Sequence, residues 1–242
     1  MSKVLLTFLL LAFAALCGCS STKTTVYPGN EQSANIPKDS LRAKFVLNMT
    51  DKDGNVQDFD AVLFSVPEHR YRLELTGALG IGVASLLWTL DGWTITFPTE
   101  KLYVKGNGYM VGLFNTDEIP LVNIHQVAGL FEGHPLPLKY DIEKVEGDKY
   151  FAVEKTGRRF TFKKDGEKIV SLSRIGRDGN DETLVFSNYK TFENVEIPSN
   201  IVFLRGDSKY LEIHIKKRTH NKPLSIGTWR LNVPKSFKPV GE

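Results

Sequence analysis

The stretch from Arg70 to Leu90 constrains the fold most, because an apolar, glycine-rich segment stands where a soluble hairpin normally has a polar turn. Before that segment, apolar and charged residues alternate from Arg70 to Leu75. After it, the run from Val83 to Leu90 is rich in β-branched, aromatic and aliphatic residues. Both patterns predict β-strands, so the segment between them is expected to be the tip of a hairpin.

The predicted tip runs from Thr76 to Gly82 and contains three glycines, which we expect to supply the special backbone angles of a sharp connection. Leu79 and Ile81 have no obvious core to enter at such a position. One interpretation is that both aliphatic side chains turn back under the sheet. The other is that Leu79, Gly80 and Ile81 form an apolar finger that contacts a membrane or an acyl chain.

The rest of the chain from Leu41 consists mainly of short alternating runs separated by turn signals, which predicts an antiparallel sandwich or barrel of about a dozen strands. The predicted strands are Leu41–Met49, Phe59–Val66, Arg70–Leu75, Val83–Leu90, Trp93–Phe97, Lys101–Lys105, Lys139–Val145, Lys149–Glu154, Arg159–Lys163, Lys168–Ile175, Glu182–Tyr189, Ile201–Arg205, Tyr210–Lys217 and Gly227–Val233. Nothing in the pattern separates two cores. We therefore expect a single domain over residues 41–242.

The series of strands is interrupted between Gly108 and Gly133. Apolar residues recur at helical spacing from Tyr109 to Phe114 and again from Leu121 to Phe131, which predicts two short helices. The second begins just after a proline and ends before Gly133, both ordinary helix boundaries. We expect this helix to cover the open end or concave face of the curved sheet as a lid or plug.

The N-terminus reads as an export signal. An uncharged apolar run from Val4 to Leu16 is too short to span a bilayer but suits a signal peptide. The following Leu16–Ser21 segment resembles the lipobox of bacterial lipoproteins. That resemblance implies cleavage after Gly18, so that residues 1–18 are the leader, and acylation of Cys19. Ser20, in place of an aspartate, implies delivery to the outer membrane. Residues 19–40 are polar and are expected to be a flexible tether.

Composition and motifs exclude several functional classes. The 31 basic residues nearly balance the 28 acidic ones, so nucleic-acid binding is not expected, and the basic run Lys216–Arg218 is interpreted as a solvated strand end. Motifs of hydrolases, metalloproteases and nucleotide enzymes are absent, and the five histidines lack metal-ligand spacing. We therefore expect neither an enzyme nor a cofactor.

Three segments together resemble the LolB family of outer-membrane lipoproteins: RYRLELTGALG at Arg70–Gly80, Ile119–Leu121 with the helix that follows it to Leu130, and the lipobox. The resemblance implies a mainly β fold, an incomplete antiparallel barrel of about eleven strands with a helical lid over an apolar cavity. It also implies a monomer anchored in the outer membrane and facing the periplasm. Such a protein accepts lipoproteins from a LolA-like periplasmic carrier and inserts them into the inner leaflet of the outer membrane.

The expected cavity would bind the acyl chains of the client lipoprotein, since transfer through water demands continuous apolar cover. The residues expected to line it are Phe45, Leu47, Leu73, Leu75, Trp88, Trp93, Ile95, Phe97, Met110, Ile124 and Phe131. Two alternatives remain open. The same architecture could bind another lipid or hydrophobic ligand, or it could be a structural envelope lipoprotein with a filled core.

Overall fold

The computed structural model describes residues 40–51, 53–107, 124–137, 139–176, 179–221 and 223–240, with the backbone alone at 124–127. These residues form one open, curved, mostly antiparallel sheet of 14 strands with a short α-helix. The strands are β1 Leu41–Thr50, β2 Val56–Val66, β3 Arg70–Thr76, β4 Gly82–Thr89, β5 Gly92–Phe97, β6 Leu102–Gly106, β7 Tyr140–Glu146, β8 Lys149–Glu154, β9 Arg159–Asp165, β10 Lys168–Ile175, β11 Asp181–Phe192, β12 Val195–Arg205, β13 Ser208–His220 and β14 Lys238–Pro239. The helices are α2 Ile124–Glu132 and the 3-10 turns η1 Ala78–Gly80 and η2 Ile226–Trp229.

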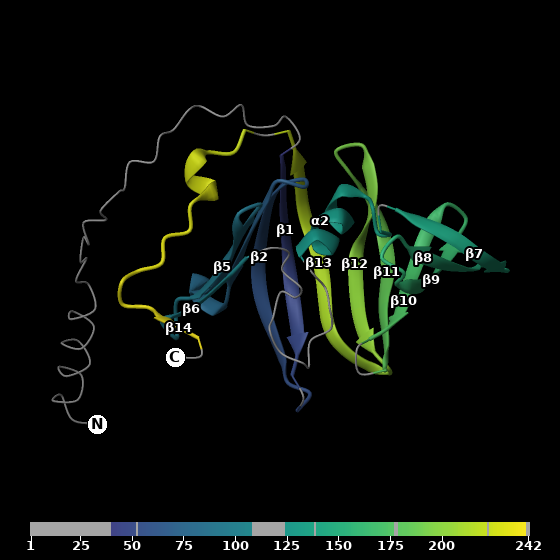
Figure 1. The fold of residues 1–242 in the computed structure, drawn as a ribbon, viewed down its shortest axis with the longest axis horizontal. Helices are drawn as coiled ribbons and strands as arrows, with labels where there is room; N and C mark the ends of the chain where they lie inside the picture. The colour runs from purple at the N-terminus through teal and green to yellow at the C-terminus, as the bar shows by residue number, and fades with distance from the viewer. Residues whose placement is uncertain are drawn as a thin grey trace, which may run out of the picture. The chain divides into compact units, whose positions relative to one another are not determined.

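The sheet consists of two antiparallel meanders, β1–β6 and β7–β13, that are joined where β1 pairs with β13. Its spatial order is β14-β6-β5-β4-β3-β2-β1-β13-β12-β11-β10-β9-β8-β7. In Figure 1 the helix α2 lies in front of the central strands, where its end contacts β1, β2 and β13. Since β14 and β7 occupy opposite ends of this order, the barrel is incomplete.

Alternation along the strands creates the core. In β1 the side chains of Leu41, Ala43, Phe45 and Leu47 are all buried, while Arg42 and Lys44 between them are exposed. The inward faces of both meanders and of α2 merge into one cluster of buried apolar side chains. The inner face of the curved sheet is therefore apolar, as the period-two pattern predicts.

Thirteen of the predicted strands coincide with β1–β13, so the mainly β fold is confirmed. Two of them start earlier than predicted, β2 at Val56 and β12 at Val195. The predicted strand at Gly227–Val233 is wrong, because the described chain there forms η2 and then continues without strand pairing. The final strand is instead β14, which pairs in parallel with β6 at the sheet edge.

Several predictions lie outside the described residues. These are the leader, Cys19, the tether up to residue 39, the helix at Tyr109–Phe114 and the start of the second helix. Among the described residues, no helix has the length and apolar character needed to cross a membrane.

Candidate functional site

The side chains expected to line an acyl-chain cavity converge on the inner face of the sheet. Those that are buried in the common cluster are Phe45, Leu47, Leu73, Leu75, Trp88, Ile95 and Phe131. Trp93 and Phe97 are half-buried and pack against that cluster. Met110 and the side chain of Ile124 lie outside the described residues. The side chains predicted from the sequence pattern thus belong to one continuous apolar surface, which is built from β1, β3, β4, β5 and α2.

Helix α2 packs directly on this surface. The Phe131 side chain is fully buried, and its ring centroid lies 4.9 Å from that of Phe45 on β1. Ala128 and Leu130 are also buried. The helix therefore lies on the inner side of the sheet, where a lid is expected. In this arrangement the candidate cavity residues pack as a core.

The C-terminal end of α2 is held by polar contacts to two strands, β13 and β2. Arg218 of β13 donates from Nε to the main-chain oxygen of Phe131 at 2.6 Å and from an Nη to that of Phe192 at 3.4 Å. Ser65 of β2 donates to a carboxylate oxygen of Glu132 at 3.2 Å. The bond from Arg218 gives the Phe131 carbonyl, one of the last carbonyls of the helix, a hydrogen-bond donor.

Arg218 is buried although the sequence analysis placed it at a solvated strand end, and that prediction is wrong. The physical reason is an irregularity in the pairing of β1 with β13. Lys44 is opposite Lys217, whereas the next residue, Phe45, is opposite Ile215. Lys216 is therefore an extra residue, a β-bulge, and it reverses the alternation beyond it. Arg218 consequently points inward with Ile215, while Lys216 and Lys217 remain exposed.

A pocket of about 520 Å³ adjoins the end of α2, and its lining includes Glu132, His134, Glu193, Arg218 and His220. Burial raises the pKa of the Glu132 carboxyl, and the hydrogen bond from Ser65 opposes this shift. Burial lowers the pKa of the Arg218 guanidinium, and the carboxylates of Glu193 and Glu132 oppose that change. Within the described ranges, no group of three or more His, Cys, Asp or Glu side chains is arranged to hold a metal ion.

The tip of the β3–β4 hairpin projects from the sheet. Leu79 is 98% exposed and Ile81 58% exposed. The turn is closed by main-chain hydrogen bonds, from Gly77 N to Ile81 O at 2.8 Å and from Ile81 N to Ala78 O at 3.3 Å. The exposure of Leu79 confirms that its side chain does not turn back under the sheet. Its contact with a membrane stays a prediction.

The backbone of this tip differs from the expectation that all three glycines supply special angles. Only Gly80 has a positive φ, 75°, whereas Gly77 has an ordinary φ of −86°. The second left-handed residue is Leu79 itself, with φ 58° and ψ 19°. A leucine is disfavoured in this conformation by about 1 kcal/mol or more. Both the backbone conformation and the solvent exposure of Leu79 are thus unfavourable for a leucine.

Arg70 and Arg72 of the RYRL segment have a role that the sequence analysis missed. They hold the C-terminal strap, residues 223–240. Arg72 donates to the main-chain oxygens of Thr228 at 2.9 Å and of Arg230 at 2.7 Å, with a longer contact to that of Gly227. The Arg70 guanidinium lies 5.2 Å from the ring centroid of Trp229. The strap therefore binds through arginine side chains, which is why it is not a strand there.

Comparison with known proteins supports the architecture but identifies no family from the sequence. Neither protein-family models nor curated protein sequences match the chain. Solved structures do match. A LolA superfamily protein from Nitrosomonas europaea aligns with a TM-score of 0.56 at 10% identity, covering 81% of this chain and 92% of that one. The fold is LolA-like.

Two further structures share the LolA-like fold. An outer membrane lipoprotein-sorting protein domain from Vibrio parahaemolyticus aligns with a TM-score of 0.53 at 12% identity, covering 80% of this chain and 90% of that one. A DUF1329 family protein from Desulfovibrio piger aligns with a TM-score of 0.53 at 13% identity, covering 79% and 89%. These identities establish a shared fold and no more.

Proposed function

We propose that this protein is a lipid-anchored acceptor of lipoproteins at the outer membrane. It would receive the acyl chains of a client from a LolA-like periplasmic carrier, bind them on the inner face of the sheet, and release the client into the inner leaflet. The role is non-catalytic and is carried out by a monomer attached through Cys19. The LolA-like fold supports a role in lipoprotein sorting or hydrophobic-ligand binding, and one structure of this fold is described as a lipoprotein-sorting domain.

The observation that carries the proposal is the conformation of Leu79. A leucine that is 98% exposed and has φ 58° gains nothing for the fold, because glycine or asparagine would suit that backbone better. Transferring one leucine side chain into lipid gives about 1.5 to 3 kcal/mol. That is too little to anchor the protein and enough to bias the hairpin toward a bilayer during release.

The supporting mechanism is displacement of α2. Ligand entry must separate Phe131 from Phe45, so the acyl chain replaces one apolar contact with another. The net affinity is the difference between the two contacts, which keeps acyl-chain binding weaker than insertion into a bilayer. With such a gradient, transfer from carrier to acceptor to membrane proceeds downhill without nucleotide hydrolysis.

The test uses Leu79→Glu in the complete lipidated protein, with Ile142→Glu as a matched control. Ile142 is also exposed, at 51%, but lies on edge strand β7 rather than at the hairpin tip. We expect Leu79→Glu to accept the client from the carrier and to fail in incorporating it into vesicles, while Ile142→Glu does both. Normal incorporation by Leu79→Glu would refute the proposed role of the hairpin.

The close packing of the inner face favours one rival, a structural lipoprotein with a filled core. Mass spectrometry of material that copurifies with the protein separates the possibilities. Lipoprotein acyl chains support the acceptor, another lipid supports a different binding protein, and the absence of any bound lipid, even after incubation with loaded carrier, supports the structural role.

A further inference from the structure

A second surface of the protein has the composition of a ligand site. A groove of about 630 Å³ lies along β8, β9 and β10, and its lining includes Lys149, Thr161 and Ser173. Its lining contains five basic side chains and two acidic ones. This excess of three positive charges equals the net charge of the whole chain, +3. The groove is therefore a local concentration of positive charge on a nearly neutral protein.

Two lysines of the lining carry like charges at opposed positions, although Glu146 of β7 is opposite Lys149 on its other side and attracts it electrostatically. Lys149 of β8 and Lys163 of β9 are directly opposite one another in the strand pairing. Among the described residues, no carboxylate lies within ion-pair distance of either side chain, although other basic residues of the lining, such as Arg159 with Glu143, do form pairs. Like charges at opposed positions destabilise a sheet. An anion bound between them would remove that repulsion.

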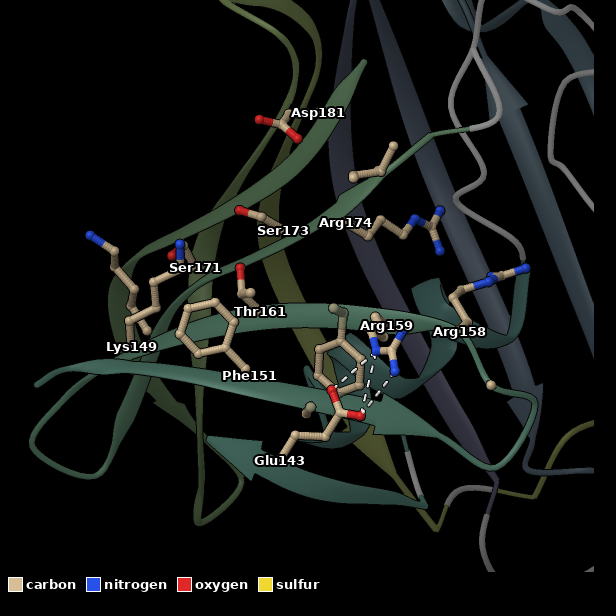
Figure 2. A pocket seen from close by; sticks show the side chains of 15 residues that line it. Glu143, Lys149, Phe151, Arg158, Arg159, Thr161, Ser171, Ser173, Arg174 and Asp181 are labelled. Carbon is tan, nitrogen blue, oxygen red and sulfur yellow. Dashed lines mark hydrogen bonds and ion pairs between the residues drawn. The ribbon is translucent and has the colours of Figure 1, made fainter. Parts of the chain in front are cut away.

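Hydroxyl groups continue the groove across the neighbouring strands. Thr161 is opposite Ser173, and Ser171 is opposite Lys163. The Ser173 hydroxyl is hydrogen-bonded to that of Thr183 at 2.9 Å, whereas no described group forms a hydrogen bond with the hydroxyls of Thr161 or Ser171. Figure 2 shows these hydroxyls between Lys149 at one end of the groove and Arg158 at the other. Ammonium, guanidinium and hydroxyl donors together suit phosphate oxygens.

The groove runs along the strands, with Ile175 and Asp181 at the end of the sheet that also carries Leu79 and with Lys149 and Lys163 toward the opposite end. In the strand pairing, β3 runs toward Thr76 and β10 toward Ile175 at the same end as the Asp51–Asn55 turn. Ile175 lines the groove and is 72% exposed. A groove with cations toward one end and an exposed aliphatic side chain at the other offers contacts for both the charged headgroups and the acyl chains of a bilayer.

We propose that this groove is a docking site for the phosphate-bearing headgroups of anionic phospholipids. With the Leu79 tip it would form a second contact between the body and the bilayer. The choice of a membrane rests on the proposed function, which places the body beside a bilayer.

The test uses the complete lipidated protein in nanodiscs of phosphatidylethanolamine, with or without phosphatidylglycerol. A fluorophore attached through Ile175→Cys reports contact with brominated lipid tails by quenching. We expect quenching to be stronger in discs with phosphatidylglycerol. It should fall to the level of the phosphatidylethanolamine discs in Lys149→Glu/Lys163→Glu, and also in about 1 M salt, where the Debye length is about 3 Å. Lys190→Glu/Lys216→Glu, a matched reversal of exposed lysines outside the groove, should keep it.

Equal quenching in both kinds of disc, or quenching that survives the groove reversal, would overturn the proposal. Binding of inorganic phosphate without any dependence on phosphatidylglycerol would identify a small-anion site and overturn the membrane assignment. Lys149→Gln/Lys163→Gln, which removes both charges without reversing them, should also lower the quenching and covers the case in which the reversal fails to fold. Client incorporation tests the proposed function and quenching tests the groove, so either can fail alone.

Discussion

The Arg218 guanidinium on β13 lies 2.6 Å from the main-chain oxygen of Phe131, the residue that fixes α2 to the sheet, although the two are 87 residues apart in the chain. This bond joins the last long strand to the end of the candidate lid. It also places a buried cation beside Glu132 and Glu193. The stability of the closed arrangement should therefore depend on Arg218, whose described contact with a predicted cavity residue is to the main-chain oxygen of Phe131.

Replacing Arg218 with methionine tests this dependence. The change leaves the carbonyls of Phe131 and Phe192 without their donor, and hydrogen bonds to charged groups contribute about 1.5 to 3 kcal/mol. We expect the free energy of unfolding to fall by roughly that amount and amide hydrogen exchange in α2 to accelerate. Lys217→Met, an exposed neighbour, serves as the control. Unchanged exchange in α2 would show that the bond does not hold the helix.

The raised pKa of Glu132 predicts a pH dependence. Because burial raises the folded-state pKa above the value of 4.5 for an exposed glutamate, the folded protein binds the proton more tightly than the unfolded chain. The contribution of Glu132 to stability is thus fully present below about pH 4.5 and is lost as the pH rises through the raised pKa. The neighbouring groups are Ser65, His134, Arg218 and Glu68.

Glu132→Gln removes this titration. We expect the variant to gain stability relative to the native protein as the pH rises from about 4 to about 7, measured by urea unfolding at each pH. A difference between the two proteins that is constant with pH would contradict the assigned shift.

The left-handed backbone at Leu79 predicts an unusual substitution effect. Asparagine tolerates φ near 58° better than leucine, and the Leu79 side chain has almost no contact to lose. We expect Leu79→Asn to leave the free energy of unfolding unchanged or to raise it by up to about 1 kcal/mol. Leu73→Asn, which replaces a buried residue of the same strand pair, should destabilise strongly. A loss of stability in Leu79→Asn would mean that Leu79 supports the fold.

The strap predicts a different outcome for Arg72. Methionine at this position removes the donors to the carbonyls of Thr228 and Arg230. We expect faster trypsin cleavage after Arg230 and a loss of about 1 to 3 kcal/mol in unfolding free energy. Arg42→Met is the matched control, since Arg42 lies over the Phe64 ring of the neighbouring strand and makes no described contact with the strap. Equal cleavage in both variants would show that the strap is held by other contacts.

The sequence predicts the strands around the centre of the sheet well because period-two alternation and burial agree there, as in Leu41–Leu47 and Arg70–Thr76. It fails where one residue breaks that period. The bulge at Lys216 turns Arg218 inward, and no local pattern announces it, because it depends on the partner strand β1. The apolar tip at Leu79 could be predicted because it has no charged residue. The lysine groove could not, since each lysine alone looks like an ordinary solvated side chain.

The strap was missed for a related reason. Gly227–Val233 has the composition of a strand, but whether such a segment pairs depends on the presence of a free sheet edge beside it. Arg72 binds main-chain carbonyls of this segment, and the Arg70 guanidinium lies over the Trp229 ring. The segment is therefore held by side chains and not by strand pairing. An alternating pattern predicts which face of a segment is buried, but it does not predict which strand the segment pairs with.

The pairing of β1 with β13 sets an order for assembly. Leu41 is opposite His220, so the two meanders can join only after β13, near the end of the chain, has been synthesised. Contacts of such long sequence separation slow folding, because loop closure must precede them. Arg218 lies on β13, so α2 lacks the hydrogen bond from Arg218 to Phe131 until β13 is in place. Until then the inner apolar face is exposed to acyl chains and to other unfolded chains. The risk of aggregation is therefore greatest between synthesis and the pairing of β1 with β13.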